Sequence, residues 1–140
     1  MMLNDLDEIL SEKGLKTKIV FLIYVDLLWA PEIEKIKNPG RFILMFAPIT
    51  RTYSKSFEAD GDLPETPPYE RNKLRFPYDV KENLAFLKSW ERVFKGDSFD
   101  FDYHFLGDHY RDPGYYSIVK VLSQDIKNLG KIGLNGFVSC

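Results

Sequence analysis

The residues of this chain best suited to chemistry fall in one alternating segment near position 100. From Phe99 to Phe105 the odd positions are aromatic, and the even positions are Asp100, Asp102 and His104. Successive residues of a strand point to opposite faces, so the pattern predicts a strand with one polar face. That face has two interpretations. Either Asp102 and His104 point into the mouth of a barrel at the carboxyl end of the strand, where active sites lie, or an edge strand turns its polar side to water.

A second polar segment follows at 107–114 and includes Asp108, His109 and Tyr110. His104 and His109 are the two histidines of the protein. Imidazole and carboxylate groups are ordinary ligands of zinc or manganese, but the spacing matches no metal motif. We therefore expect no metal. His109 and Tyr110 are instead suited to stack on a sugar ring or to form hydrogen bonds with it.

Two further side chains stand just after expected strands. Asp26 lies between Tyr24 and Trp29, and a carboxylate beside aromatic rings offers an acid or base together with flat surfaces for sugar faces. The alternative is a carboxylate that caps the turn before Pro31. Arg51 is able to bind a substrate carboxylate through its planar fork, or it pairs with one of the acids named above.

Composition excludes several other classes of function. The 19 basic and 21 acidic residues give a net charge of −2, which provides no surplus to hold a nucleic-acid backbone. The glycine-rich segment 130–136 follows a helix and precedes a strand, the reverse of a dinucleotide-binding loop, and we expect no cofactor. No Walker loop, Gly-x-Ser-x-Gly elbow or Cys/His nucleophile pair occurs.

The sequence predicts a protein of a reducing compartment that does not enter a membrane. Cys140 is the single cysteine, so no disulfide within the chain is possible. The first residues lack the basic and apolar regions of a signal peptide. The most apolar stretch, 19–29, is interrupted by Asp26 and is too short for a membrane span. We expect a cytoplasmic location.

Helical and strand patterns alternate along the chain. Asp79 is expected to cap one helix, and Asp112, followed by Pro113, is expected to cap another. Four prolines and many charges between 52 and 77 predict a long irregular connection, which is usually functional or mobile. In chain order we expect a helix at 3–10, a strand at 18–25, a short helix at 31–36, a strand at 42–47, a helix at 80–94, a strand at 99–105, a helix at 113–129 and a strand at 134–139.

This alternation predicts one α/β domain over residues 1–140 with a parallel sheet and right-handed crossovers. Two observations predict that the domain is only part of a larger fold. Four βα units are about half of a (βα)-barrel, whose usual size is ~250 residues. The chain also stops at Cys140 directly after an apolar strand. We expect a fragment, a half barrel.

Several motifs resemble one bacterial family, the large proteins catalogued as domain of unknown function 4838. The resemblance covers nearly the whole chain after Thr17 and is most specific from Phe101 to Gly114. Its motifs are 41–51, Trp90-Glu91-Arg92, Gly96-Asp97, Phe101-Asp102-Tyr103-His104, Asp108-His109, Asp112-Pro113-Gly114 and Gly133-Leu134-Asn135-Gly136.

Proteins of that family are longer, and their central domain is similar to glycoside-hydrolase barrels, including hexosaminidase-like and glucuronidase-like enzymes. The resemblance implies that this chain is the C-terminal half of such a barrel. The family has no established activity, so it supplies no known catalytic residue. The positions that match it are candidates only: Asp26, Arg51, Asp102, His104, Asp108 and His109.

We therefore expect a carbohydrate-binding or carbohydrate-processing function in which Asp102 or Asp26 acts as acid, base or charge stabiliser. His104 and His109 would position the substrate, and Arg51 would anchor a polar group or an anion. The further residues of this expected site are Asp108, Tyr110 and Trp29. A half barrel should lack a full pair of carboxylates around one bond, so the isolated chain is expected to be inactive.

The alternative class is a stand-alone α/β binding or interaction module without catalysis, whose aromatic residues form a partner surface. In either case exposed sheet edges favour self-association as a homodimer or a larger assembly. One form of it would be two half barrels that close against each other. We expect neither nucleic acid nor a membrane as a partner.

Overall fold

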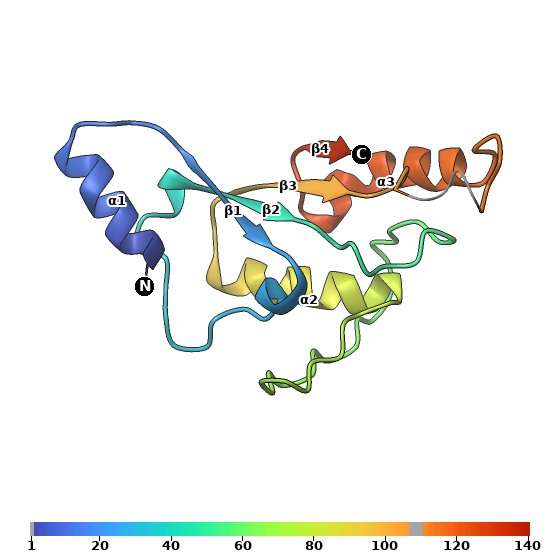
Figure 1. Ribbon diagram of the computed structural model, residues 1–140, viewed down its shortest axis with the longest axis horizontal. Helices are drawn as coiled ribbons and strands as arrows, with labels where there is room; N and C mark the ends of the chain where they lie inside the picture. Colours follow the sequence, from blue (N-terminus) through green and yellow to red (C-terminus); the bar gives the residue numbers. More distant parts are fainter. Residues whose placement is uncertain (1, 107–110) are drawn as a thin grey trace.

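A computed structural model of the chain describes residues 2–106 and 111–140. Its centre is a sheet of four parallel strands in the order β1-β2-β3-β4 (Figure 1). The strands are β1 (Ile19–Ile23), β2 (Phe42–Phe46), β3 (Asp97–Asp102) and β4 (Phe137–Ser139). Neighbours in sequence are neighbours in the sheet, so the predicted parallel α/β class is confirmed.

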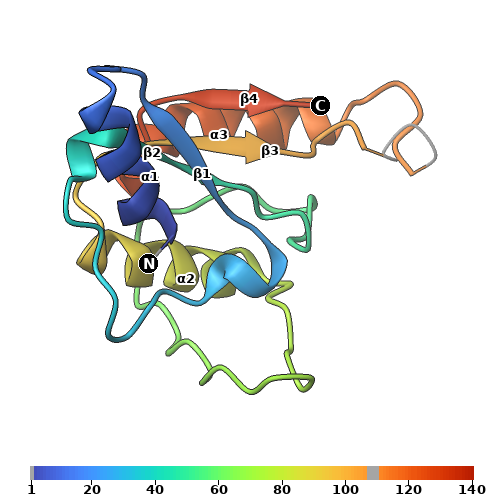
Figure 2. The same cartoon turned by 60° about the vertical axis from the view of Figure 1, so that its left-hand side comes forward.

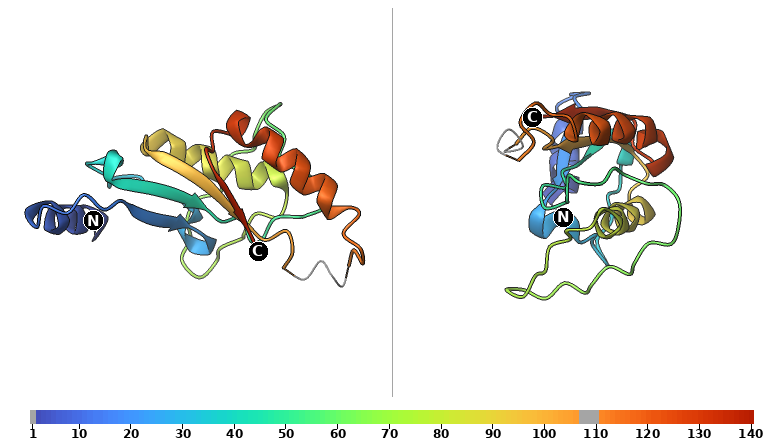
Figure 3. Two further views of the ribbon diagram at one scale, coloured as in Figure 1. Left: turned by 90° about the horizontal axis from the view of Figure 1, so that it is seen from above. Right: turned by 90° about the vertical axis from the view of Figure 1, so that its right-hand side faces the viewer.

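Two long helices cover one face of this sheet. Helix α2 (Val80–Val93) connects β2 to β3, and α3 (Ile118–Ile132) connects β3 to β4. Trp90 of α2 packs on Phe21 of β1, and Asp125 of α3 bonds to His104 beyond β3. The strand register places these contacts on the same side, which we call the covered face (Figures 2 and 3). Within the described residues, no helix has the length and apolar character of a membrane span.

The covered face carries a core rich in aromatic side chains. The Phe21 ring lies 5.0 Å from Phe94 and 5.5 Å from Trp90, and it meets Phe42 edge-on at 6.3 Å. The Trp90 indole nitrogen donates to the carbonyl oxygen of Leu28 at 3.0 Å. Tilted and edge-to-face ring pairs of this kind add to the gain from burial. They fix α2 against the first two strands.

The opposite face of the sheet, which we call the uncovered face, is apolar. Neither α2 nor α3 packs on it. The side chains of the edge strands are the most open, with Val20 50% and Val138 47% exposed. By alternation along the strands, this face consists of Val20, Leu22, Ile43, Met45, Phe99, Phe101 and Val138, with the exposed Asp97 at the amino end of β3.

Helix α1 (Met2–Glu12) lies apart from the other helices, at the amino ends of the strands (Figures 1 and 3). Polar contacts hold it there. The Arg41 guanidinium donates to Asp7 at 2.6 Å and to the carbonyl oxygen of Leu15 at 2.7 Å. The buried Asn4 amide bonds to the backbone of Lys35 and Lys37. This attachment keeps α1 away from the carboxyl ends of the strands.

The start of α2 follows the sequence prediction closely. The Asp79 carboxylate accepts from the Lys81 amide at 2.9 Å, and the Glu82 carboxylate accepts from the Asp79 amide at 3.1 Å. This reciprocal capping box satisfies backbone donors that the first turn leaves free. The predicted cap is confirmed.

Several expected elements differ from the structure, among them the strand expected at 134–139, which begins only at Phe137. The helix expected at 31–36 does not form, and short 3-10 helices occur at Val25–Leu28 and Pro39–Arg41 instead. The last helix begins at Ile118 rather than at 113, although the Asp112 carboxylate still accepts from the Ser117 and Ile118 amides. The strand expected at 99–105 ends at Asp102, which leaves His104 beyond it.

The long connection at 52–77 is attached to the fold at several points. The Thr50 hydroxyl donates to the Pro77 carbonyl oxygen at 2.6 Å, and the Trp29 indole donates to that of Pro67 at 2.7 Å. Phe57 is fully buried, and its backbone bonds to Asp125 and Asn128 of α3. Because of these contacts, the first part of the connection packs between the sheet and α3.

Candidate functional site

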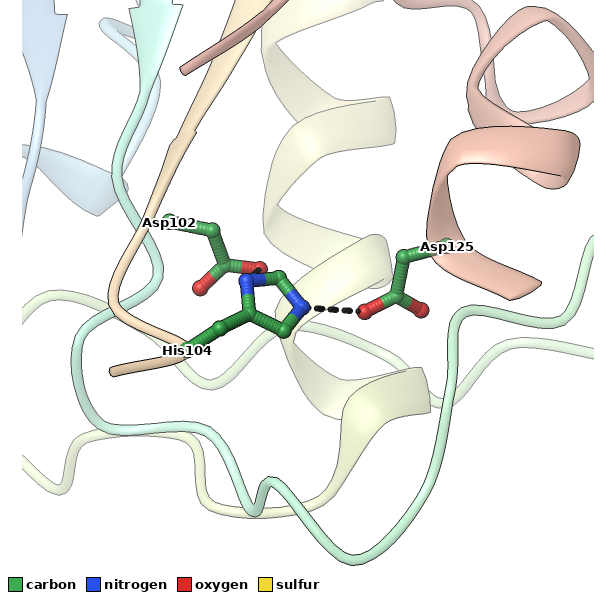
Figure 4. Close-up of side chains that lie close together, drawn as sticks. All are labelled: Asp102, His104 and Asp125. Atoms are coloured by element: carbon green, nitrogen blue, oxygen red, sulfur yellow. Dashed lines mark hydrogen bonds and ion pairs between the residues drawn. The ribbon is translucent and has the colours of Figure 1, made fainter. Parts of the chain in front are cut away.

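Four charged or titratable side chains from distant parts of the sequence meet at the carboxyl ends of β2 and β3. Arg51 follows β2, Asp102 ends β3, and His104 lies two residues further on. Asp125 comes from the middle of α3. Figure 4 shows the last three, with the imidazole of His104 between the two carboxylates. Parallel strands end at the same edge of a sheet, which explains why the crossovers bring these residues together.

Arg51 connects the two aspartates. Its Nη1 lies 2.8 Å from Oδ2 of Asp102, and its Nη2 lies 2.8 Å from Oδ2 of Asp125. Nη2 also donates to the Lys55 carbonyl oxygen at 3.0 Å. The guanidinium carbon lies 3.9 Å from the centre of the Phe57 ring. All three charged side chains are completely shielded from solvent. A buried charge is tolerated when it is paired and hydrogen-bonded, and this network meets both conditions.

Tyr53 and His104 complete the network. The Tyr53 hydroxyl donates to Oδ1 of Asp102 at 2.6 Å. Burial, and then the charge of Asp102, raise the pKa of Tyr53 far above its ordinary value, so the phenol remains a donor. His104 Nε2 lies 2.9 Å from Oδ2 of Asp125, and Nδ1 lies 3.3 Å from the Ser139 hydroxyl oxygen. A carboxylate only accepts, so Nε2 carries the hydrogen in this bond.

Asp100 differs from its neighbours because nothing bonds to its side chain. It is fully buried on the covered face, and neither carboxyl oxygen has a hydrogen-bond partner within the described part of the chain. In the register of the sheet it lies between Phe46 and Phe137. Burial, and then the negative charge of Asp102, raise the pKa of Asp100 well above 3.8. The Asp100 carboxyl therefore holds a proton at pH values where an exposed aspartate is ionised.

The arrangement corrects both interpretations of the polar face of β3. Asp102 and His104 point neither into an open mouth nor into water, because both are fully buried on the covered face. The aromatic face, with Phe99 and Phe101, is the one without a helix. The proposed role of Arg51 as an anchor for a substrate carboxylate is also wrong. The guanidinium is occupied by two aspartates, which was the alternative expectation.

The same contacts bear on metal binding. One ligand atom from each of Asp102, His104 and Asp125 lies within 4.8 Å of the others. However, the Arg51 fork bonds to the Oδ2 atom of each carboxylate and supplies the positive charge. A cation could bind to the three residues only if this guanidinium withdrew. The donor set therefore favours an ion-pair network.

The remaining predicted site residues are separate from this network. Asp26 is exposed in the 3-10 helix after β1, and β2 lies between β1 and β3 in the sheet. Trp29 lies 4.8 Å from the Phe86 ring of α2, where it has a packing role. Three predicted residues lie outside the described part of the chain: Asp108, His109 and Tyr110.

Sequence reasoning missed Asp125, Tyr53 and Ser139. Asp125 carried a usable signal, because it falls at helical spacing from Val121 and Ile132, which are buried in α3. A carboxylate within the apolar stripe of a helix must find a buried partner. Tyr53 and Ser139 carried no comparable signal.

Comparisons with known proteins return no match. No protein-family model matches the chain, and no curated protein or solved structure matches it either. The interpretation of the site rests on its own geometry and chemistry.

Proposed function

We propose that this chain forms half of the wall of a glycoside-hydrolase-like barrel and binds carbohydrate there. One observation carries the proposal. Four parallel strands follow one another in sequence order, with both long helices on one face and an apolar surface on the other. In a (βα)-barrel of eight strands, helices surround the outside and mostly branched apolar side chains fill the inside. The resemblance of the sequence to proteins with such barrels supports the same interpretation.

The uncovered face would then be part of the barrel interior. Ile43 and Met45 at its centre are half-buried, and Val20 and Val138 at its edges are about half exposed. A second set of four strands would cover these side chains. It would also pair the free edges of β1 and β4.

The carboxyl end of the uncovered face offers groups suited to a sugar. Tyr24 follows β1 with an extended backbone, directly after Ile23 of the covered face, so it belongs to the uncovered face. Tyr103 follows β3, and its ring lies 5.4 Å from the ring of Phe101 on that same face. Burial, and then the phenol of Tyr24, raise the pKa of Tyr103. Asp26 is exposed nearby in the sequence. It replaces the enclosed Asp102 as the proposed acid or base.

Glycan binding by the full chain tests this proposal. We expect isothermal titration to detect binding of neutral oligosaccharides and Tyr103→Ala to weaken it about tenfold, the effect of losing one well-packed aromatic contact. Tyr116→Ala serves as the matched control, because Tyr116 is 79% exposed and takes part in none of these contacts. Turnover is not expected, because a single exposed carboxylate does not make an acid–base pair. Absence of glycan binding would refute the proposal.

The open surface also favours the second candidate function, a non-catalytic interaction module. Here we propose that the occupant is a second copy of the chain. A two-fold axis parallel to the strands would keep all strands parallel and place β4 of each copy beside β1 of the other. The dimer would then have eight strands, the number in a closed barrel. Light scattering after size-exclusion chromatography should then give a dimer. A stable monomer would contradict self-association.

A further inference from the structure

A cavity with both polar and apolar walls lies on the covered side of the sheet. It has a volume of about 300 Å³ and lies between the segment after β2 and the beginning of α3. We call it the carboxyl-edge pocket. The lining residues used below are Thr52, Tyr53, Ser54, Tyr78, Arg111, Asp112 and Ser117. Tyr53 and α3 both belong to the covered face, so the pocket and the Tyr103 ring lie on opposite faces of the sheet, although the Tyr53 hydroxyl accepts from the Tyr103 amide at 3.2 Å.

The floor of this pocket is held in place by the buried network. Arg51 forms part of it and is fixed by two aspartates. The Tyr53 hydroxyl is held by Asp102. The Thr52 amide donates to the Tyr78 carbonyl oxygen at 2.8 Å, and the Thr52 and Ser54 hydroxyls lie 2.8 Å apart. A binding site is effective when such supporting contacts fix its walls in advance.

The rim, in contrast, offers groups that are free to bind. Within residues 2–106 and 111–140, the side chains of Arg111, Tyr78 and Ser117 have no hydrogen-bond or ion-pair partner. Tyr78 is 67% exposed. Asp112 uses Oδ2 to accept from the Ser117 and Ile118 amides at 2.8 and 2.9 Å. Its Oδ1 atom accepts no hydrogen bond from the part of the chain that the structure describes.

The charges of the pocket favour a neutral ligand. Arg111 and Asp112 carry opposite charges, and the charge of Arg51 is already balanced by Asp102 and Asp125. The first free amides of α3, which would otherwise attract an anion, are occupied by Asp112. A phosphate would therefore find little excess positive charge. A neutral ring bearing hydroxyl groups could use both the donors and the acceptors of the rim.

The aromatic side chains narrow the ligand class further. Tyrosine combines a flat apolar ring with a polar hydroxyl, and a sugar has apolar C–H faces and hydroxyl edges to match. The volume lies at the small end of the range for ligand sites. We propose that the carboxyl-edge pocket binds one neutral sugar residue, stacked on Tyr78 and held by Arg111 and Asp112. This inference rests on the proposed carbohydrate-binding function and adds a second, separate subsite to it.

Titration of the full chain by nuclear magnetic resonance tests the inference, with glucose and galactose as neutral probes and glucuronate and inorganic phosphate as anionic ones. We expect the neutral sugars to shift resonances of Thr52, Ser54 and Ser117. Tyr78→Ala and Arg111→Ala should each weaken this binding about tenfold, as loss of one central contact does. The matched controls Tyr116→Ala and Arg71→Ala replace exposed residues that do not line the pocket, and we expect less than about a twofold change.

The other outcomes separate this inference from the proposed function. If Tyr103→Ala weakens sugar binding and the Tyr78 and Arg111 variants do not, the pocket is excluded and the proposed function stands. If phosphate binds to the pocket and neutral sugars do not, it is an anion site and the inference is wrong. If no sugar binds anywhere on the wild-type chain, both proposals fail.

Discussion

The covered face of the sheet buries charged side chains, whereas the uncovered face leaves apolar ones partly in contact with water. On the covered face Arg51, Asp102 and Asp125 satisfy one another and are fully enclosed. On the uncovered face Val20 and Val138 remain about half exposed. A dense group of charges is therefore not by itself a reaction centre. In this molecule the surface left partly exposed to water is the apolar one, and an exposed apolar surface is what indicates a ligand or a partner.

The largest expected effect comes from removing the cation of the covered face. Arg51→Met would leave Asp102 and Asp125 buried without their counter-ion, and we expect the free energy of unfolding to fall by about 3–5 kcal/mol. Urea denaturation measures it, with Arg71→Met as an exposed control. A triple variant that also replaces both aspartates by leucine should recover much of the loss. A loss below about 1 kcal/mol for the single variant would contradict the role assigned to Arg51.

An effect of opposite sign is expected at Asp100, whose two carboxyl oxygens have no hydrogen-bond partner among the described residues. Asp100→Val should raise the free energy of unfolding by about 1–3 kcal/mol at neutral pH, because it removes an unsatisfied buried carboxyl.

The gain should grow with pH. The unfolded Asp100 carboxyl titrates near 3.8 and the folded one well above that value. Between the two pKa values the folded state keeps a proton that the unfolded state has released, so the wild-type protein loses stability as pH rises. Urea denaturation from pH 4 to 8 measures this slope. Asp100→Asn, which does not titrate, should reduce the slope with a smaller gain in stability. An unchanged slope in both variants would show that Asp100 is ionised in the folded protein.

The smallest effect on stability is expected on the uncovered face. Val20→Lys places a charge on a half-exposed position of edge strand β1, and the free energy of unfolding of the monomer should change by no more than about 0.5 kcal/mol. The same charge should lower the dimer fraction in light scattering, because lysine on an edge opposes strand pairing. Val20→Thr is the uncharged control. Equal dimer fractions in all three proteins would show that the β1 edge is not part of the dimer interface.

Sequence patterns predicted the elements that are determined by residues close together in the chain. The buried runs of β1 and β2 and the helix cap at Asp79 depend on neighbours in sequence, and the sequence contains them. The expected helix at 31–36 failed although Ile33 and Ile36 follow Pro31 at helical spacing, because Ile33 is 88% exposed and gains nothing from burial. Short apolar runs do not settle where an element ends.

The site was harder to predict for a physical reason. Alternation identified Asp100, Asp102 and His104 as one face of β3, but it contains no information on which face the helices cover. That choice depends on the crossover through α3. Asp125 supplies the partner of His104 from 21 residues away and of Arg51 from 74. Pairings at such separations are set by the topology.

The long separation within the charged network has a consequence for the order of folding. Asp125 is synthesised 74 residues after Arg51, an interval of roughly 4–15 s at typical rates of translation. The other partner, Asp102, follows Arg51 by 51 residues, so the Arg51 guanidinium first lacks both carboxylate partners and then lacks Asp125. Enclosing it during this interval would leave a poorly compensated charge. We expect the loop after β2 to stay open until α3 has docked. The network would then form late in folding. The loop after β2 would pack against the sheet only after the last helix has docked.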